Sequence, residues 1–135
     1  MRRRQWFTAL SLLLLSACGT QAAEVNFTLP DVRQVSHTLR DLRGRWVVIN
    51  VWASWCPPCL REMPEFEAFY QRHKQTISVL GVNYEPSTAQ DIQAFIKNKF
   101  GTLGFPILLS NGQPFGGLTL RGMPTTFIVS PKGEL

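Results

Sequence analysis

Residues 46–59 read Trp-Val-Val-Ile-Asn-Val-Trp-Ala-Ser-Trp-Cys-Pro-Pro-Cys and carry the strongest structural signal in the chain. Its first half is a nearly continuous run of β-branched and aromatic residues, which predicts a strand buried on both faces of a sheet. Apolar residues at helical spacing follow directly and predict a helix from Leu60 to about His73. The cysteine pair is therefore expected at a junction between a strand and a helix.

The predicted helix has a buried stripe and one irregularity. Pro64 lies inside it, where a missing hydrogen bond is expected to produce a kink. Four side chains recur at helical spacing and are expected to face the core: Met63, Phe66, Phe69 and Tyr70.

The rest of the chain alternates between strand and helix patterns. A second helix is expected to open at a capping box over residues 87–90 and to stop near Gly101. Further strands are expected over residues 25–29, 35–39, 77–84, 105–109 and 125–129. Such alternation implies an α/β fold with a largely parallel sheet covered on both sides, preceded by an N-terminal hairpin.

Length and charge restrict the protein classes. A chain of 135 residues is long enough for one domain with a modest core. The formal charge of +5 owes much to Arg2, Arg3 and Arg4, without which 11 basic and 9 acidic residues remain. That balance gives no reason to expect nucleic acid as a partner.

The first residues have the pattern of an export signal. The three arginines precede an apolar run over residues 6–17, which is too short to span a bilayer as a helix. Residues 15–18, Leu-Ser-Ala-Cys, resemble a lipobox, so we expect residues 1–22 to be a lipoprotein signal and short tether, with Cys18 lipidated. An ordinary signal cut near Ala22 or Ala23 is the alternative. Residues 23–135 would then form the domain, on the periplasmic or cell-envelope side of a membrane.

The spacing of Cys56 and Cys59 favours redox chemistry. Two intervening residues at the start of a helix let both sulfurs meet in a small ring. The first thiol then lies where unpaired N–H groups and the helix dipole favour a thiolate. Cys56 is therefore expected to attack a disulfide, and Cys59, one turn inside the helix, to resolve the mixed disulfide.

Other interpretations of the cysteine pair fit less well. A zinc site needs a second pair of ligands, and His37 and His73 are isolated in the sequence. Haem attachment would need a histidine where Leu60 stands. A purely structural disulfide closing so small a loop would stabilise the fold little. No metal or cofactor is expected.

Residues 52–59, Pro64 and the run Gly-Met-Pro-Thr-Thr at 122–126 together resemble thioredoxin, and more narrowly the exported TlpA/ResA-type disulfide reductases. The resemblance covers about residue 27 to the C-terminus. It implies a thioredoxin-like fold with a cis peptide bond before Pro124, the Met123 backbone pairing with substrate, and Trp55 over the sulfur site. It also implies a last strand and helix beyond residue 135, so we expect strand 125–129 to be an open edge, and either the chain is truncated or a partner completes the domain.

Three further residues are assigned from the neighbourhood of the pair. Such families carry a buried acid that moves protons for the resolving thiol. Glu85 falls near that place but is displaced by one residue, so an exposed carboxylate is the alternative. Neither Pro57 nor Pro58 can donate an N–H to Cys56, which predicts a weakly stabilised thiolate and a reducing pair. Its potential is expected nearer the thioredoxin value of about −270 mV than the strongly oxidising value of about −120 mV.

The expected activity is reduction of disulfides in exported proteins, including the cysteine pair of apocytochrome c as one candidate. The resemblance implies recharging by a membrane thiol-electron carrier. A peroxide-reducing redoxin is one alternative, although a peroxide motif would need proline at Ile49 and threonine at Ala53. A copper-handling protein of the same fold is the other, although such proteins have three residues between the cysteines.

Overall fold

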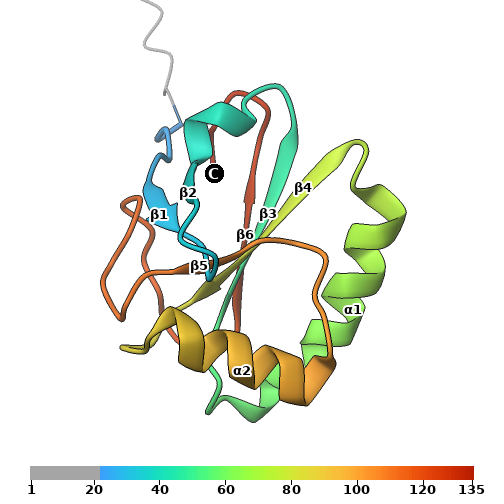
Figure 1. The fold of residues 1–135 in the computed structure, drawn as a ribbon. Helices are drawn as coiled ribbons and strands as arrows, with labels where there is room; N and C mark the ends of the chain where they lie inside the picture. The colour runs from blue at the N-terminus through green and yellow to red at the C-terminus, as the bar shows by residue number, and fades with distance from the viewer. Residues whose placement is uncertain (1–21) are drawn as a thin grey trace, which may run out of the picture.

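The computed structural model describes residues 22–135. It is a four-stranded sheet with a small hairpin beside it (Figure 1). The expected signal segment and Cys18 lie outside the described residues. Within residues 22–135, no helix combines the length and the apolar character needed to cross a membrane.

The central sheet has the strand order β5-β4-β3-β6. Strands β3 (Trp46–Trp52), β4 (Ile77–Asn83) and β5 (Ile107–Leu109) are parallel, and β6 (Thr125–Val129) runs antiparallel to β3 at the edge. The predicted parallel core and edge position of β6 are confirmed. Strand β5 is shorter than predicted. Strand β3 is buried except at Val48, which is half-buried, and at Trp46, which is 51% exposed.

The N-terminal hairpin consists of β1 (Thr28–Pro30) and β2 (Ser36–Thr38), which pair antiparallel. A short 3-10 turn, Leu39–Leu42, follows. The hairpin prediction is confirmed, but β1 starts later than predicted. The reason is that the preceding residues pair elsewhere, since Val25 donates its N–H to the Gly133 carbonyl.

The two helices begin as their capping residues dictate. Helix α1 (Pro57–His73) starts earlier than predicted, because proline is tolerated in a first turn that has no N–H partner to lose. It continues as one helix through Pro64. Helix α2 (Ala89–Phe100) has Gly101 as its C-cap and so stops where predicted. Its cap is one residue later than predicted, because Thr88 accepts the Asp91 N–H and donates its hydroxyl to the Asp91 carboxylate.

Both helices lie on the same face of the sheet, and the sheet is covered on both sides as expected. Buried residues of α1 and α2 share one cluster with Val79 of β4 and Ile107 of β5. The opposite face packs against the N-terminal segment and a loop, through residues that include Phe27, Leu39 and Phe115 (Figure 1). Non-helical segments thus provide the second layer.

The predicted stripe of α1 is only partly buried. Met63 is fully buried, whereas Phe66 and Phe69 are half-buried and line a hollow of about 530 Å³ together with Ile128 of β6. Ile128 is 56% exposed. The stripe extends beyond β3 toward the edge strand, and no described element covers it there.

Candidate functional site

Cys56 and Cys59 form a disulfide at the N-terminus of α1. Their Cα atoms are 5.3 Å apart. Strand β3 ends at Trp52, and a turn closed by the Cys56 N–H on the Ala53 carbonyl, at 3.2 Å, leads into the helix. The junction predicted from the sequence therefore positions the pair.

Cys56 is the N-cap residue of α1, and its Sγ accepts the N–H of Cys59 at 3.4 Å. An N-cap side chain ordinarily accepts from the second or third residue of the helix. Here the second is Pro58, which has no N–H, so the third residue alone supplies a donor from this turn. Cys56 is 4% exposed and Cys59 1% exposed, so the two residues differ in exposure only slightly.

A groove of about 380 Å³ lies beside the pair. The Met123–Pro124 peptide bond is cis, as the resemblance implied, and Met123 packs against the cluster that contains both cysteines. Trp55 is 65% exposed and lines the same groove. The groove is also lined by Gly122, which belongs to the run at 122–126, and by three residues that the sequence did not single out: Tyr84, Leu120 and Arg121. Their signal in the sequence was only their nearness to Met123 or to the end of β4.

Glu85 lies near the pair but is not an isolated surface carboxylate. It is half-buried, and it accepts hydrogen bonds from Ser54 and Asn83. Glu62, on the first turns of α1, is exposed. The structure therefore brings Glu85 to the turn before Cys56 and leaves Glu62 in solvent.

The two histidines are engaged in separate places. His37 Nε2 lies 2.9 Å from Oδ2 of Asp31, a buried carboxylate that the sequence did not single out. His73 stacks on Phe69 with ring centroids 4.6 Å apart. Among residues 22–135, no three side chains of the metal-ligating types His, Cys, Asp and Glu come together as a candidate metal site.

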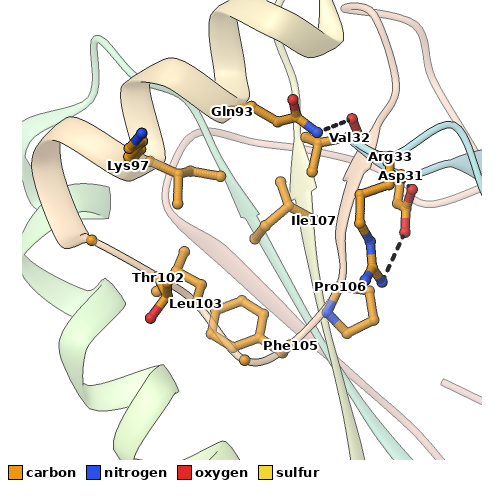
Figure 2. A pocket seen from close by; sticks show the side chains of 13 residues that line it. Asp31, Val32, Arg33, Gln93, Lys97, Thr102, Leu103, Phe105, Pro106 and Ile107 are labelled. Carbon is orange, nitrogen blue, oxygen red and sulfur yellow. Dashed lines mark hydrogen bonds and ion pairs between the residues drawn. The ribbon is translucent and has the colours of Figure 1, made fainter.

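A second hollow, of about 410 Å³, lies between α2 and the segment that leads into β5 (Figure 2). Its walls include Phe105 and Ile107, and Gln93 closes one side by donating to the Val32 carbonyl. It contains no cysteine. Neither cysteine lines the smaller groove either, but Trp55 of that groove precedes Cys56 in the chain, and its Met123 packs against the cluster that contains both cysteines.

A disulfide at a helix N-terminus, on a mostly parallel sheet and beside a cis-proline loop, defines the class of thiol–disulfide oxidoreductases with a thioredoxin-like fold. The chain belongs to the AhpC/TSA family, which matches residues 19–135.

Individual relatives agree with this class. The chain is 38% identical to the thiol-disulfide oxidoreductase ResA of Halalkalibacterium halodurans over 124 residues, covering 90% of this chain and 67% of that protein. It is 34% identical to ResA of Geobacillus kaustophilus over 146 residues, covering 95% and 82%. The crystal structure of StoA from Bacillus subtilis superimposes with a TM-score of 0.67 at 30% identity, covering 84% and 86%. Within the family, the chain is a thiol–disulfide oxidoreductase.

Proposed function

We propose that the protein reduces disulfides in exported proteins through the Cys56–Cys59 dithiol. The observation that carries this proposal is the single first-turn donor to the Cys56 sulfur, the N–H of Cys59 at 3.4 Å. Fewer donors stabilise a thiolate less and so stabilise the reduced form less. A pair of this kind gives up electrons readily.

The reaction has two exchange steps. The Cys56 thiolate attacks one sulfur of the substrate disulfide, whose bond breaks as a mixed disulfide forms, and the departing substrate thiolate takes up a proton. Cys59 then loses its proton and attacks Cys56 Sγ, which releases the second substrate thiolate. Two electrons pass to the substrate and the Cys56–Cys59 disulfide forms. A dithiol carrier in the membrane would return the protein to its reduced state.

The groove beside the pair is the proposed substrate site. Trp55 offers an exposed aromatic face, and the backbone of Met123 before cis-Pro124 would pair with an extended substrate segment. Arg121 is exposed at the same groove and would favour an acidic residue in that segment. Apocytochrome c, with two cysteines awaiting haem, is one candidate substrate.

We further propose export and lipid anchoring through residues 1–22, with acylation at Cys18. The basic and apolar segments and the lipobox support this proposal. The test is the mass of the mature N-terminus in cells. A diacylglycerol adduct on Cys18 that is lost in Cys18→Ala would support the anchor, and a soluble product cut after Ala23 would contradict it.

Peroxide reduction and copper handling remain the competing functions. A peroxide-reducing protein would consume peroxide through Cys56 faster than it reduces protein disulfides. A copper-handling protein would bind the metal stoichiometrically without disulfide turnover. Assaying the reduced protein with peroxide, Cu(I) and a protein disulfide in parallel separates the three.

The most direct functional test is substrate trapping with Cys59→Ser, which leaves Cys56 able to form a mixed disulfide but removes the resolving thiol. We expect disulfide-linked adducts with exported proteins that dithiothreitol releases. The double variant Cys56→Ser/Cys59→Ser is the control and should trap none. Equal trapping by both variants would contradict the proposal.

A further inference from the structure

Glu85 connects the end of β4 to the active-site turn that follows the neighbouring strand β3. It follows β4, and its Oε1 accepts the backbone N–H of Ser54 at 3.0 Å. Its Oε2 accepts the Ser54 hydroxyl at 3.0 Å. Asn83 Nδ2 donates to Oε1 at 2.7 Å. All three partners are donors, which suits a carboxylate because it only accepts.

The turn that Glu85 holds is the one that presents Cys56. The regular pairing of the strands ends where Tyr84 donates its N–H to the Trp52 carbonyl at 2.9 Å. Ser54 lies two residues beyond that bond and two residues before Cys56. Since Ser54 has left the sheet, the Glu85 carboxylate replaces the missing strand partner for its N–H.

The carboxylate is itself held in place. Asn83 is fully buried, and its amide donates to the same Glu85 oxygen that accepts the Ser54 N–H. Because Asn83 already fixes the Glu85 carboxylate, that carboxylate loses little further conformational freedom when it binds Ser54. Asn83, Glu85 and Ser54 thus link β4 to the segment that carries Trp55 and Cys56.

We propose that Glu85 is a positioning residue for the redox reaction, which holds the turn Ala53–Cys56 so that Trp55 and Cys56 keep their places relative to the groove. It acts through Ser54 and does not carry the proton of Cys59. This inference rests on the proposed function, since the position of the turn matters only if Cys56 exchanges with a substrate held in the groove.

The experiment compares Glu85→Ala, Glu85→Gln and a matched control, Glu67→Ala. Glu67 is also half-buried and also accepts a backbone N–H, that of Gly104 at 2.7 Å. It lies on α1 and binds the loop before β5, not the turn that carries Cys56. Two quantities are measured on each full-length protein. The first is hydrogen exchange of the Ser54 amide without substrate, and the second is the rate constant for reduction of a protein disulfide.

We expect Glu85→Ala to speed exchange of the Ser54 amide about tenfold or more and to slow disulfide reduction about tenfold, as the loss of hydrogen bonds to a charged group implies. Glu85→Gln should restore most of both, because an amide oxygen can accept the Ser54 and Asn83 N–H groups and its NH₂ can donate to the hydroxyl. Glu67→Ala should leave both unchanged.

Two results would overturn the inference. One is a Glu85→Ala protein whose Ser54 exchange and reduction rate match those of Glu67→Ala. The other is a Glu85→Gln protein as slow as Glu85→Ala, which would assign the role to the charge or to proton transfer. A wild-type protein that reduces no disulfide would contradict the proposed function, whereas Ser54 exchange still decides whether Glu85 holds the turn.

Discussion

The backbone N–H of Cys59 points at Cys56 Sγ from 3.4 Å, across a turn whose two intervening residues have no N–H at all. Sequence and geometry combine here, because Pro57 and Pro58 remove donors that most helix N-termini would offer. The pKa of the Cys56 thiol and the redox potential of the pair therefore depend on which of the two prolines removes a donor to Cys56 Sγ.

Pro58→Ala restores an N–H at the second helical position, where N-cap side chains find a donor. We expect a lower pKa for the Cys56 thiol and a potential higher by about 20–30 mV, the value of one hydrogen bond to a thiolate. Pro57→Ala is the control, since the first position does not face the cap. Thiolate absorbance and glutathione equilibrium measure the two effects. Equal shifts in both variants would contradict the account.

Trp55→Ala is expected to weaken binding of protein substrates without changing the chemistry of Cys56. KM for a protein disulfide should rise about tenfold or more, because an exposed aromatic side chain at a groove is a typical binding anchor. Reaction with oxidised glutathione should change little. Trp46→Ala removes another exposed indole, 51% exposed at the far end of β3, and should alter neither rate. Equal losses for both disulfides would instead indicate damage to the pair.

Asp31 makes the stability of the N-terminal hairpin sensitive to acid. Burial alone would raise the pKa of Asp31, but hydrogen bonds from His37 and from the Val35 and Arg33 N–H groups outweigh burial and lower it below its usual 3.8. A carboxylate with a depressed folded pKa stabilises the fold above the unfolded pKa, and this stabilisation is lost as pH falls through the folded pKa.

Asp31→Asn should therefore flatten the decline in the urea midpoint below about pH 4, and at pH 7 it should lower the free energy of unfolding by about 1 kcal/mol. The exposed Asp41 offers the control Asp41→Asn. If the urea midpoint of Asp31→Asn declined at acid pH as steeply as that of the wild type, protonation of Asp31 would not be linked to unfolding.

Gly81 in β4 leaves room for neighbouring core side chains. A Cβ there would lie 2.7 Å from Cδ1 of Ile107 and 3.0 Å from Cε2 of Phe105. Gly81→Ala should lower the free energy of unfolding by about 1–3 kcal/mol through overpacking. The double variant Gly81→Ala/Ile107→Val removes the clashing methyl and should cost less than the sum of the two single variants in urea unfolding. If the losses of unfolding free energy in the two single variants simply added up in the double variant, contact with Ile107 would not be the source of the strain.

The core of the fold followed from local patterns. The apolar run of β3, the cysteine spacing and the helical period of α1 are all short-range signals, and each identified its element. The side of the sheet on which α2 packs depends on the whole chain path, so alternation alone did not indicate that both helices share one face. Helix α1 starts earlier than its apolar period indicated, because that period begins only at Leu60, whereas the first turn tolerates Pro57 and Pro58.

The candidate site was predictable in its sulfurs and less so in its surroundings. Cys56, Cys59 and the cis bond before Pro124 carry sequence signatures. The bond between Ser54 and Glu85 joins residues 31 positions apart, and the contact of His37 with Asp31 depends on how the hairpin turns. Neither has a local pattern, so only the folded chain reveals them.

The central claim is that Cys56 and Cys59 form a reducing pair, and its most direct test is the equilibrium of the protein with glutathione. The fraction of Cys56–Cys59 disulfide is trapped across redox buffers, with Cys56→Ser as the variant that cannot form it. We predict a potential nearer about −270 mV than about −120 mV. A value above roughly −160 mV would make the protein an oxidant or isomerase and contradict the interpretation of the two prolines.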